Sequence, residues 1–217
     1  VFFTGNPAFV NIKNTKSISK NKLFKKLRFS NNNYIVLINH PLSSELIDTK
    51  EQTELLLSAL KIFCLKNNYH TICIPPNSDP GSHDIKRIIN EFDTESWFVK
   101  LETQPRDIFI NLIRNAKTLI GNSSMGILEA PFYKLPVINV GNRQKGRLNA
   151  GNVKFISHDE SQIIEALNRA CLNSAYRSKI SKLINPFGDE NSAINIKNAI
   201  ESINLSDRKW YIKRKLC

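Results

Sequence analysis

The chain has 217 residues, of which 41% are hydrophobic, enough to bury one sizeable core. No apolar run approaches the ~20 residues of a membrane helix, and no basic region precedes the apolar first residues, so we expect neither a membrane span nor a signal peptide. The net charge of +12 favours anionic partners, either nucleic acid or small substrates. The four cysteines lack metal-type spacing, which favours free thiols and a cytoplasmic location.

Short apolar segments alternate with helical patterns from residue 34 onward. Strands are expected at residues 34–39, 70–74, 97–101, 117–121, 136–141 and 153–156. Helices are expected at residues 49–66, 83–92, 105–116, 124–133, 159–172, 175–183 and 191–203. Because strands and helices alternate at least five times with short connections, we predict an α/β fold with a doubly wound, mostly parallel, Rossmann-like sheet.

Polar side chains follow four of the expected strands. These side chains belong to His40, Asn77, Asp79, Ser123, Ser124 and Arg143. In doubly wound sheets ligands bind outside the carboxyl ends of the strands, so these residues are expected to share one site.

The turn "GNSSMG", residues 121–126, lies where a strand is expected to become a helix. Free backbone N–H groups and the hydroxyls of Ser123 and Ser124 favour an anion there, and the flanking glycines allow close approach. A serine that merely caps the helix fits the turn equally well. Glu129 lies about one and a half turns further on, where it could accept hydrogen bonds from a ribose diol or be an exposed helix residue.

The other candidates also have two interpretations each. His40 could act as a general acid or a donor to phosphate, although a lone histidine is more often structural. Asn77 and Asp79 could form an Asx-turn. Arg143 could contact an oxyanion or simply lie on the surface. The fingerprints for dinucleotide and ATP binding are absent from the sequence.

Five motifs in order, "TGNPAF", "NHPLSSE", "PPNSDPGS", "LIGNSSMGILEAPFYKLPVINVGNRQKGR" and "NV", resemble the hydrolysing UDP-N-acetylglucosamine 2-epimerases. The resemblance runs from about Thr4 to about Ser202, and the block at 119–147 favours the hydrolysing branch. It implies a glycosyltransferase-B-type enzyme with two Rossmann-like domains and a cleft between them. This chain would be the C-terminal half, with a UDP-binding domain at residues 1–205 and a basic tail at 206–217.

The resemblance also implies a reaction. UDP is eliminated from UDP-N-acetylglucosamine to give a 2-acetamidoglycal, and water then adds to release N-acetylmannosamine, with no metal or redox cofactor. His40 would assist departure of UDP, Ser123 and Ser124 would bind the diphosphate, and Glu129 would bind the ribose. Asn77 and Arg143 would make further nucleotide-sugar contacts.

One departure from the family pattern is visible, because Leu128 stands where many relatives have arginine. The resemblance also places most proton-transferring carboxylates in an N-terminal half that this chain lacks, so we expect the chain alone to be inactive. The family tends to form dimers or tetramers, which implies a homo-oligomer for the full-length protein.

Three alternatives remain at this point. The sister enzyme acts on UDP-2,4-diacetamido-2,4,6-trideoxyhexose in legionaminic acid synthesis. The positive charge suggests a nucleic-acid-binding module, although basic residues interleaved with aromatic ones are confined to the end of the chain. The chain could also be an assembly domain without catalysis, which the presence of His40 and Glu129 disfavours. We expect UDP and a UDP-N-acetylhexosamine as ligands, and neither nucleic acid nor a membrane as a partner.

Overall fold

The computed structural model describes residues 1–27, 29, 33–204 and 206–207. It divides into two compact units, one of residues 15–186 and one of residues 1–14 together with residues from 187 onward. Most of the basic tail expected at 206–217 lies outside the described residues. No helix in the described ranges is long and apolar enough to cross a membrane.

The larger unit contains a six-stranded sheet in the order β3-β2-β1-β4-β5-β6. The strands are β1 Tyr34–Ile38, β2 His70–Cys73, β3 Phe98–Lys100, β4 Thr118–Gly121, β5 Val137–Val140 and β6 Val153–Ile156. Every neighbouring pair is parallel. The predicted doubly wound parallel sheet is therefore confirmed, and its strand order reverses between β1 and β4, where such sheets bind ligands.

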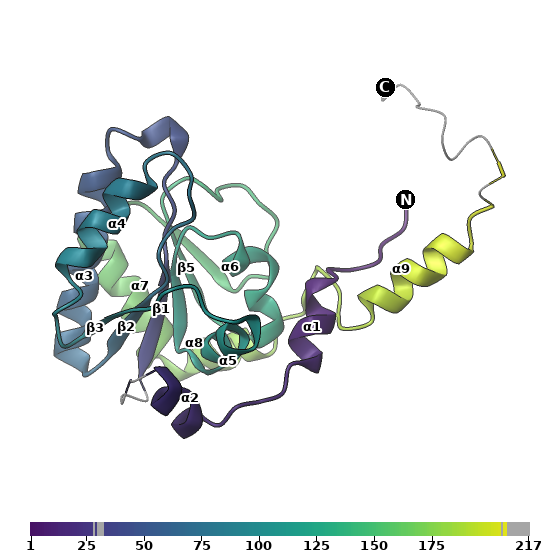
Figure 1. Ribbon diagram of the computed structural model, residues 1–217, viewed down its shortest axis with the longest axis horizontal. Helices are drawn as coiled ribbons and strands as arrows, with labels where there is room; N and C mark the ends of the chain where they lie inside the picture. Colours follow the sequence, from purple (N-terminus) through teal and green to yellow (C-terminus); the bar gives the residue numbers. More distant parts are fainter. Residues whose placement is uncertain (28, 30–32, 205, 208–217) are drawn as a thin grey trace. The chain divides into compact units, whose positions relative to one another are not determined.

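Two hydrophobic clusters cover the two faces of the sheet, as the alternation of side chains along β1 illustrates. Ile35 and Leu37 belong to one cluster, and Val36 and Ile38 to the other. The first cluster packs against α3 Thr49–Asn67, α4 Ser82–Glu91 and α7 Glu160–Leu172, and the second against α2 Lys20–Leu27 and α5 Arg106–Asn115. Figure 1 shows α3 and α4 on one side of the strands and α5 on the other. After β6 the chain forms α7 and then α8 Ser174–Ser181.

Several elements differ from the sequence prediction, and one of these differences has a clear physical cause. The single helix expected at 124–133 is instead a short helix, α6 Met125–Leu128, followed by a 3-10 turn, η2 Ala130–Tyr133. Pro131 lacks an N–H and interrupts the helical hydrogen bonds. A further 3-10 turn, η1 Ser43–Glu45, and the helices α1 Ala8–Asn14 and α2 were not predicted.

The smaller unit consists mainly of α1 Ala8–Asn14 and α9 Ser192–Glu201, the second of which corresponds to the helix expected at 191–203. The Ser192 hydroxyl donates to the Asn6 carbonyl oxygen at 2.9 Å and so links the two ends of the chain within this unit. Lys13 and Glu190 form an exposed ion pair at 3.2 Å.

The cysteines of the described part of the chain are buried free thiols, at Cys64, Cys73 and Cys171. Burial raises the pKa of each thiol, so all three are protonated at neutral pH. The fourth, Cys217, lies outside the described residues.

Candidate functional site

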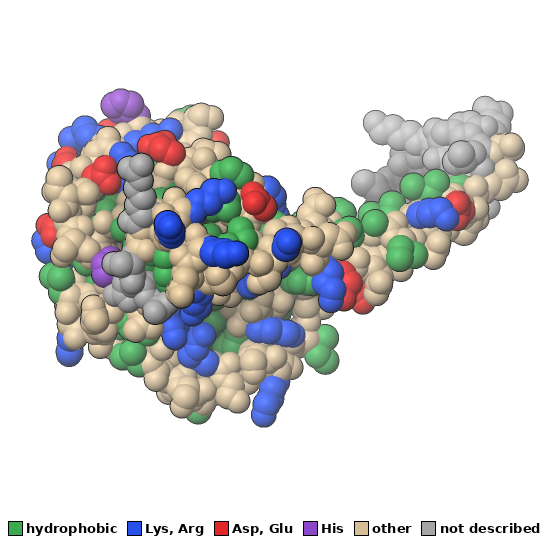
Figure 2. Space-filling view, turned by 60° about the horizontal axis from the view of Figure 1, so that its bottom comes forward, with side chains coloured by type: hydrophobic (Ala, Val, Ile, Leu, Met, Phe, Trp, Pro, Cys, Tyr) green, Lys and Arg blue, Asp and Glu red, His purple; other side chains and the backbone are tan. Residues whose placement is uncertain are grey.

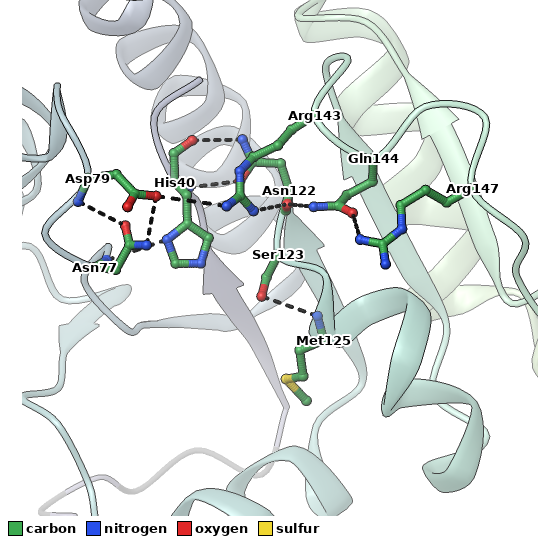
Figure 3. A network of polar contacts seen from close by, with 9 residues as sticks. All are labelled: His40, Asn77, Asp79, Asn122, Ser123, Met125, Arg143, Gln144 and Arg147. Carbon is green, nitrogen blue, oxygen red and sulfur yellow. Dashed lines mark hydrogen bonds and ion pairs between the residues drawn. The ribbon is translucent and has the colours of Figure 1, made fainter. Parts of the chain in front are cut away.

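The candidate site lies at the carboxyl edge of the sheet, where β1 and β4 end side by side. Their last residues, Ile38 and Gly121, are partners in the parallel register. His40 and Ser123 each follow two residues later, so the two strands deliver them to the same edge. Figure 3 shows the polar network there, which contains His40, Asn77, Asp79, Asn122, Ser123, Met125, Arg143, Gln144 and Arg147.

Gly121 permits the close approach between the two strand ends. Its φ is +124°, and a Cβ at this position would lie 2.1 Å from the Ile38 carbonyl oxygen. The next residue, Asn122, donates its backbone N–H to that same oxygen at 3.2 Å. Only glycine fits this position, so the first glycine of the turn is required by the packing of β1 against β4.

The buried Asn122 side chain fixes the backbone of His40 at two points. Asn122 Oδ1 accepts from the His40 backbone N–H at 2.7 Å, and Asn122 Nδ2 donates to the His40 carbonyl oxygen at 2.8 Å. The sequence analysis did not identify Asn122 as a site residue. In the sequence, Asn122 is only an amide side chain inside the serine turn. Its partner His40 lies 82 positions earlier in the chain, so the pairing is not visible from local sequence.

The loop after β5 is tied to the same turn. The Asn122 carbonyl oxygen accepts from Arg143 Nη1 at 3.2 Å and from the buried Gln144 side chain at 3.1 Å. Arg147 in turn donates to Gln144 Oε1 at 2.7 Å. Gln144 and Arg147 were not predicted; Gln144 ties the loop that carries Arg143 to the serine turn, and Arg147 holds the Gln144 side chain.

The His40 ring is half-buried and hydrogen-bonded. Its Nδ1 accepts from the backbone N–H of Asn77 at 3.4 Å, which leaves Nε2 to carry the proton of the neutral ring. Burial lowers the pKa of His40 and the Arg143 charge lowers it further, whereas a hydrogen bond with the Asn77 side chain and the Asp79 charge raise it. His40 is therefore neutral at pH 7, with an N–H available as a donor.

The loop after β2 supplies the other side of the network. Asn77 Nδ2 donates to Asp79 Oδ2 at 2.7 Å, and Asn77 Oδ1 accepts from the Asp79 backbone N–H at 3.4 Å. This is the Asx-type turn considered from the sequence. Arg143 Nη2 lies 3.9 Å from Asp79 Oδ2, so the guanidinium group is oriented by a carboxylate as well as by the serine turn.

The two serines differ in their hydrogen bonding. Ser123 Oγ accepts from the Met125 backbone N–H at 3.4 Å, a long cap-like contact. The half-buried Ser124 hydroxyl makes no hydrogen bond to any residue that the structure describes. α6 has four residues and contributes little dipole, so an anion there would depend on the hydroxyls and on Arg143.

Glu129 is separate from the His40 network. It lies at the end of α6, and its Oε2 accepts from Arg106 Nη2 at 2.7 Å. The carboxylate is 20% exposed and the guanidinium side chain 48% exposed. Arg106 begins α5 directly after Pro105, and nothing in the sequence pointed to its pairing with Glu129.

The described part of the chain contains no group of three or more His, Cys, Asp or Glu side chains that could hold a metal ion. Besides the Asp79 carboxylate, which is engaged by Asn77 and Arg143, the groups that converge at the edge are a neutral histidine, an arginine, two serine hydroxyls and backbone amides. These are donors, and donors in this arrangement can bind an oxyanion and stabilise negative charge that develops on it.

The face that carries α2 is strongly basic. Lys22, Lys25 and Lys26 of this helix are exposed. Burial lowers the pKa of Lys117, and the nearby charges of Arg177 and Lys20 lower it further. Figure 2 shows many Lys and Arg side chains on the side of the molecule brought forward there, with few Asp or Glu side chains among them.

Comparison with known proteins identifies one family. The family model described as UDP-N-acetylglucosamine 2-epimerase matches residues 1–201. Polysialic acid biosynthesis protein P7 of Escherichia coli is 32% identical over 182 residues, which cover 82% of this chain and 46% of the relative. A hydrolysing UDP-N,N'-diacetylbacillosamine 2-epimerase of Legionella pneumophila is 32% identical over 190 residues, which cover 87% of this chain and 48% of the relative.

A solved structure agrees at the level of the fold. The S. aureus MnaA–UDP co-structure has a TM-score of 0.72 at 19% identity, covering 93% of this chain and 52% of that one. The larger unit thus has the Rossmann-like architecture of glycosyltransferase-B-type proteins. The chain spans about half the length of the curated relatives it matches.

Proposed function

The chain belongs to the UDP-N-acetylglucosamine 2-epimerase family, and on this premise we propose that it is the UDP-binding half of a hydrolysing UDP-sugar 2-epimerase. The preferred substrate is UDP-N-acetylglucosamine. UDP leaves C1 as the C2 proton is removed, and water then adds to the 2-acetamidoglycal to give N-acetylmannosamine. The observation that carries the proposal is the clamp of Asn122 on the His40 backbone, which anchors a residue with a neutral N–H donor to the serine turn.

His40 acts on the leaving group. Negative charge builds on the UDP oxygens only as the C1–O bond breaks, so a donor directed at them stabilises the transition state more than the substrate. The lowered pKa keeps His40 neutral in the resting enzyme. The bond from Asn77 to Nδ1 leaves Nε2–H as the donating group.

The remaining site residues bind. Ser123, Ser124 and Arg143 hold the diphosphate, and Asn77 contributes a further contact through its side chain. Glu129 accepts hydrogen bonds from the ribose hydroxyls. These contacts are made in the ground state as well as in the transition state, so they contribute mainly to affinity.

The groups that move the C2 proton belong to a second domain. The chain spans about half the length of its curated relatives. Among the described site residues, most are hydrogen-bond donors, Glu129 lies outside the His40 network, and Asp79 is the one carboxylate next to His40. Asp79 is already engaged by Asn77 and Arg143. We therefore expect the 217-residue chain to bind UDP weakly and to release no N-acetylmannosamine from UDP-N-acetylglucosamine.

Calorimetric titration of the chain with UDP tests this function. The variant Ser123→Ala/Ser124→Ala should bind UDP about 10²- to 10⁴-fold more weakly, since it removes two hydroxyl donors and each hydrogen bond to a charged group is worth roughly 1.5–3 kcal/mol. Ser178→Ala, on the exposed side of α8, is the matched control and should bind as the wild type does. Equal UDP binding by all three proteins, or turnover by the chain alone, would contradict the proposal.

The name of the Legionella relative supports a second substrate, UDP-N,N'-diacetylbacillosamine. The two sugars differ at carbons 4 and 6, which the other domain is expected to contact. Supplying both UDP-sugars to an enzyme with both domains and identifying the released sugar would distinguish them.

The basic face around α2 and Lys117 supports a third candidate of a different class, a nucleic-acid-binding module. Titration with RNA at several salt concentrations, alongside UDP, separates this candidate from the first. Tight, salt-dependent RNA binding without UDP binding would favour it.

A further inference from the structure

Arg106 has no role in the proposed function, yet its side chain is fixed at two points. Its Nη2 lies 2.7 Å from Glu129 Oε2, a contact that is both a hydrogen bond and an ion pair. Its guanidinium carbon lies 5.7 Å from the centroid of the Phe109 ring, one turn further along α5. The side chain is therefore directed towards the end of α6 although nearly half of its surface is exposed.

The pair is unlike an ordinary surface salt bridge, because its acidic partner is mostly buried. Glu129 is only 20% exposed, so its charge is less screened by water than that of a surface carboxylate. Among the described residues Arg106 is the one cation paired with it. Leu128, directly before Glu129, provides no charge.

Only one oxygen of the carboxylate is used by this pair. Arg106 holds Oε2, while Oε1 makes no hydrogen bond to a described residue and can still accept from a hydroxyl. Burial raises the pKa of the nearby Tyr133, and the Glu129 charge raises it further. Tyr133 therefore keeps its proton and adds no second negative charge to this end of α6.

The position of Glu129 explains why a cation is needed. α6 begins directly after Ser124 and ends directly before Glu129, and four helical residues rise by roughly 6 Å. A poorly screened carboxylate at this distance from the serine turn would repel a bound diphosphate. The Arg106 guanidinium group, 2.7 Å from Oε2, offsets that charge and also selects the carboxylate rotamer.

We propose that Arg106 is a positioning residue of the nucleotide site, which orients Glu129 towards the ribose hydroxyls and neutralises it beside the diphosphate. This inference rests on the proposed function. It requires two separable effects of Arg106. One is recognition of the ribose hydroxyls through Glu129, and the other is an electrostatic effect on any nucleoside diphosphate.

Calorimetric titration of the 217-residue chain with UDP and with 2′,3′-dideoxy-UDP separates these effects. The wild type should prefer UDP by about tenfold, the scale of one to two hydrogen bonds. Glu129→Gln and Arg106→Gln should each reduce this preference to about threefold or less. Arg106→Lys, which keeps the charge but not the planar fork, should lose the preference while retaining affinity for dideoxy-UDP.

The electrostatic effect has its own signature in the double variant. Arg106→Gln alone should weaken binding of dideoxy-UDP at low salt, because Glu129 is then uncompensated. Arg106→Gln/Glu129→Gln should restore that affinity to near the wild-type value. Arg87→Gln, which removes an exposed cation paired with Asp84 at 4.0 Å, is the charge-matched control and should change neither ligand's affinity.

Two outcomes would overturn the inference. If Arg106→Gln kept the full wild-type preference for UDP and matched Arg87→Gln, the inference alone would fail. If the wild-type chain bound no UDP, the proposed function would fail and the inference with it. Thermal unfolding of each variant shows that the comparison is between folded proteins, and the half-exposed Arg106 should tolerate both substitutions.

Discussion

Replacing Asn122 with alanine should destabilise the larger unit and release His40. The substitution removes two hydrogen bonds, of 2.7 Å and 2.8 Å, and leaves the backbone N–H and C=O of His40 without those partners. An unsatisfied buried polar group costs roughly 1–3 kcal/mol, and because His40 is only half-buried we expect a total of about 2–4 kcal/mol. For a domain of this size that corresponds to a fall in Tm of about 5–15 °C.

Thermal and urea unfolding followed by circular dichroism measure this loss. Asn168→Ala is the matched control, since Asn168 is exposed on α7, and it should change the free energy of unfolding by less than about 1 kcal/mol. Asn122→Asp keeps the acceptor for the His40 N–H but loses the donor, and its negative charge should raise the pKa of His40. A Tm of Asn122→Ala within about 1 °C of the wild type would refute the clamp.

Three further predictions concern the same edge of the sheet. Gly121→Ala should lower the free energy of unfolding by more than about 4 kcal/mol or prevent folding, because its Cβ would lie 2.1 Å from a carbonyl oxygen. Gly146 lies in open space at a φ of +80°, so Gly146→Ala should lower the free energy measured in denaturant unfolding by only about 1 kcal/mol. Because the pKa of His40 is lowered in the folded protein, the contribution of His40 to stability is present above the unfolded-state pKa of about 6.5 and is lost as pH falls. His40→Gln should therefore flatten the pH dependence of the free energy of unfolding between about pH 7 and 5. Arg143→Gln should raise the pKa of His40 measured by NMR. In a reconstituted two-domain enzyme, His40→Ala should lower kcat by roughly 10²-fold, while Glu129→Ala should mainly raise KM; the reverse pattern in steady-state kinetics would show that these roles are misassigned.

The strands were predictable because the sheet is parallel and buried on both faces. The segment 34–38 is a short, continuous, buried apolar run, as is typical of a central parallel strand, whereas the edge strand at 153–156 contains the exposed Lys154. Helix α2 was not predicted, because half of its eight residues are lysines. Its buried residues, Leu23, Phe24 and Leu27, do have helical spacing, but they span little more than one turn.

The candidate site was predictable only in part. Strand ends place His40 and Ser123 at one edge of a doubly wound sheet, so their proximity follows from the topology. The clamp by Asn122 could not be predicted, because it joins residues 82 positions apart through side-chain geometry. The same holds for Arg106, whose partner Glu129 lies 23 positions away on another element.

The central claim is that UDP binds at the carboxyl edge of the sheet, between the ends of β1 and β4. Two-dimensional NMR of the isotope-labelled chain during titration with UDP tests it most directly. We predict that the largest changes in amide chemical shift occur at residues 121–126 and at Glu129, with a change at the His40 ring. Saturable shifts confined to α2 and Lys117, or no shifts at all at millimolar UDP, would contradict the account.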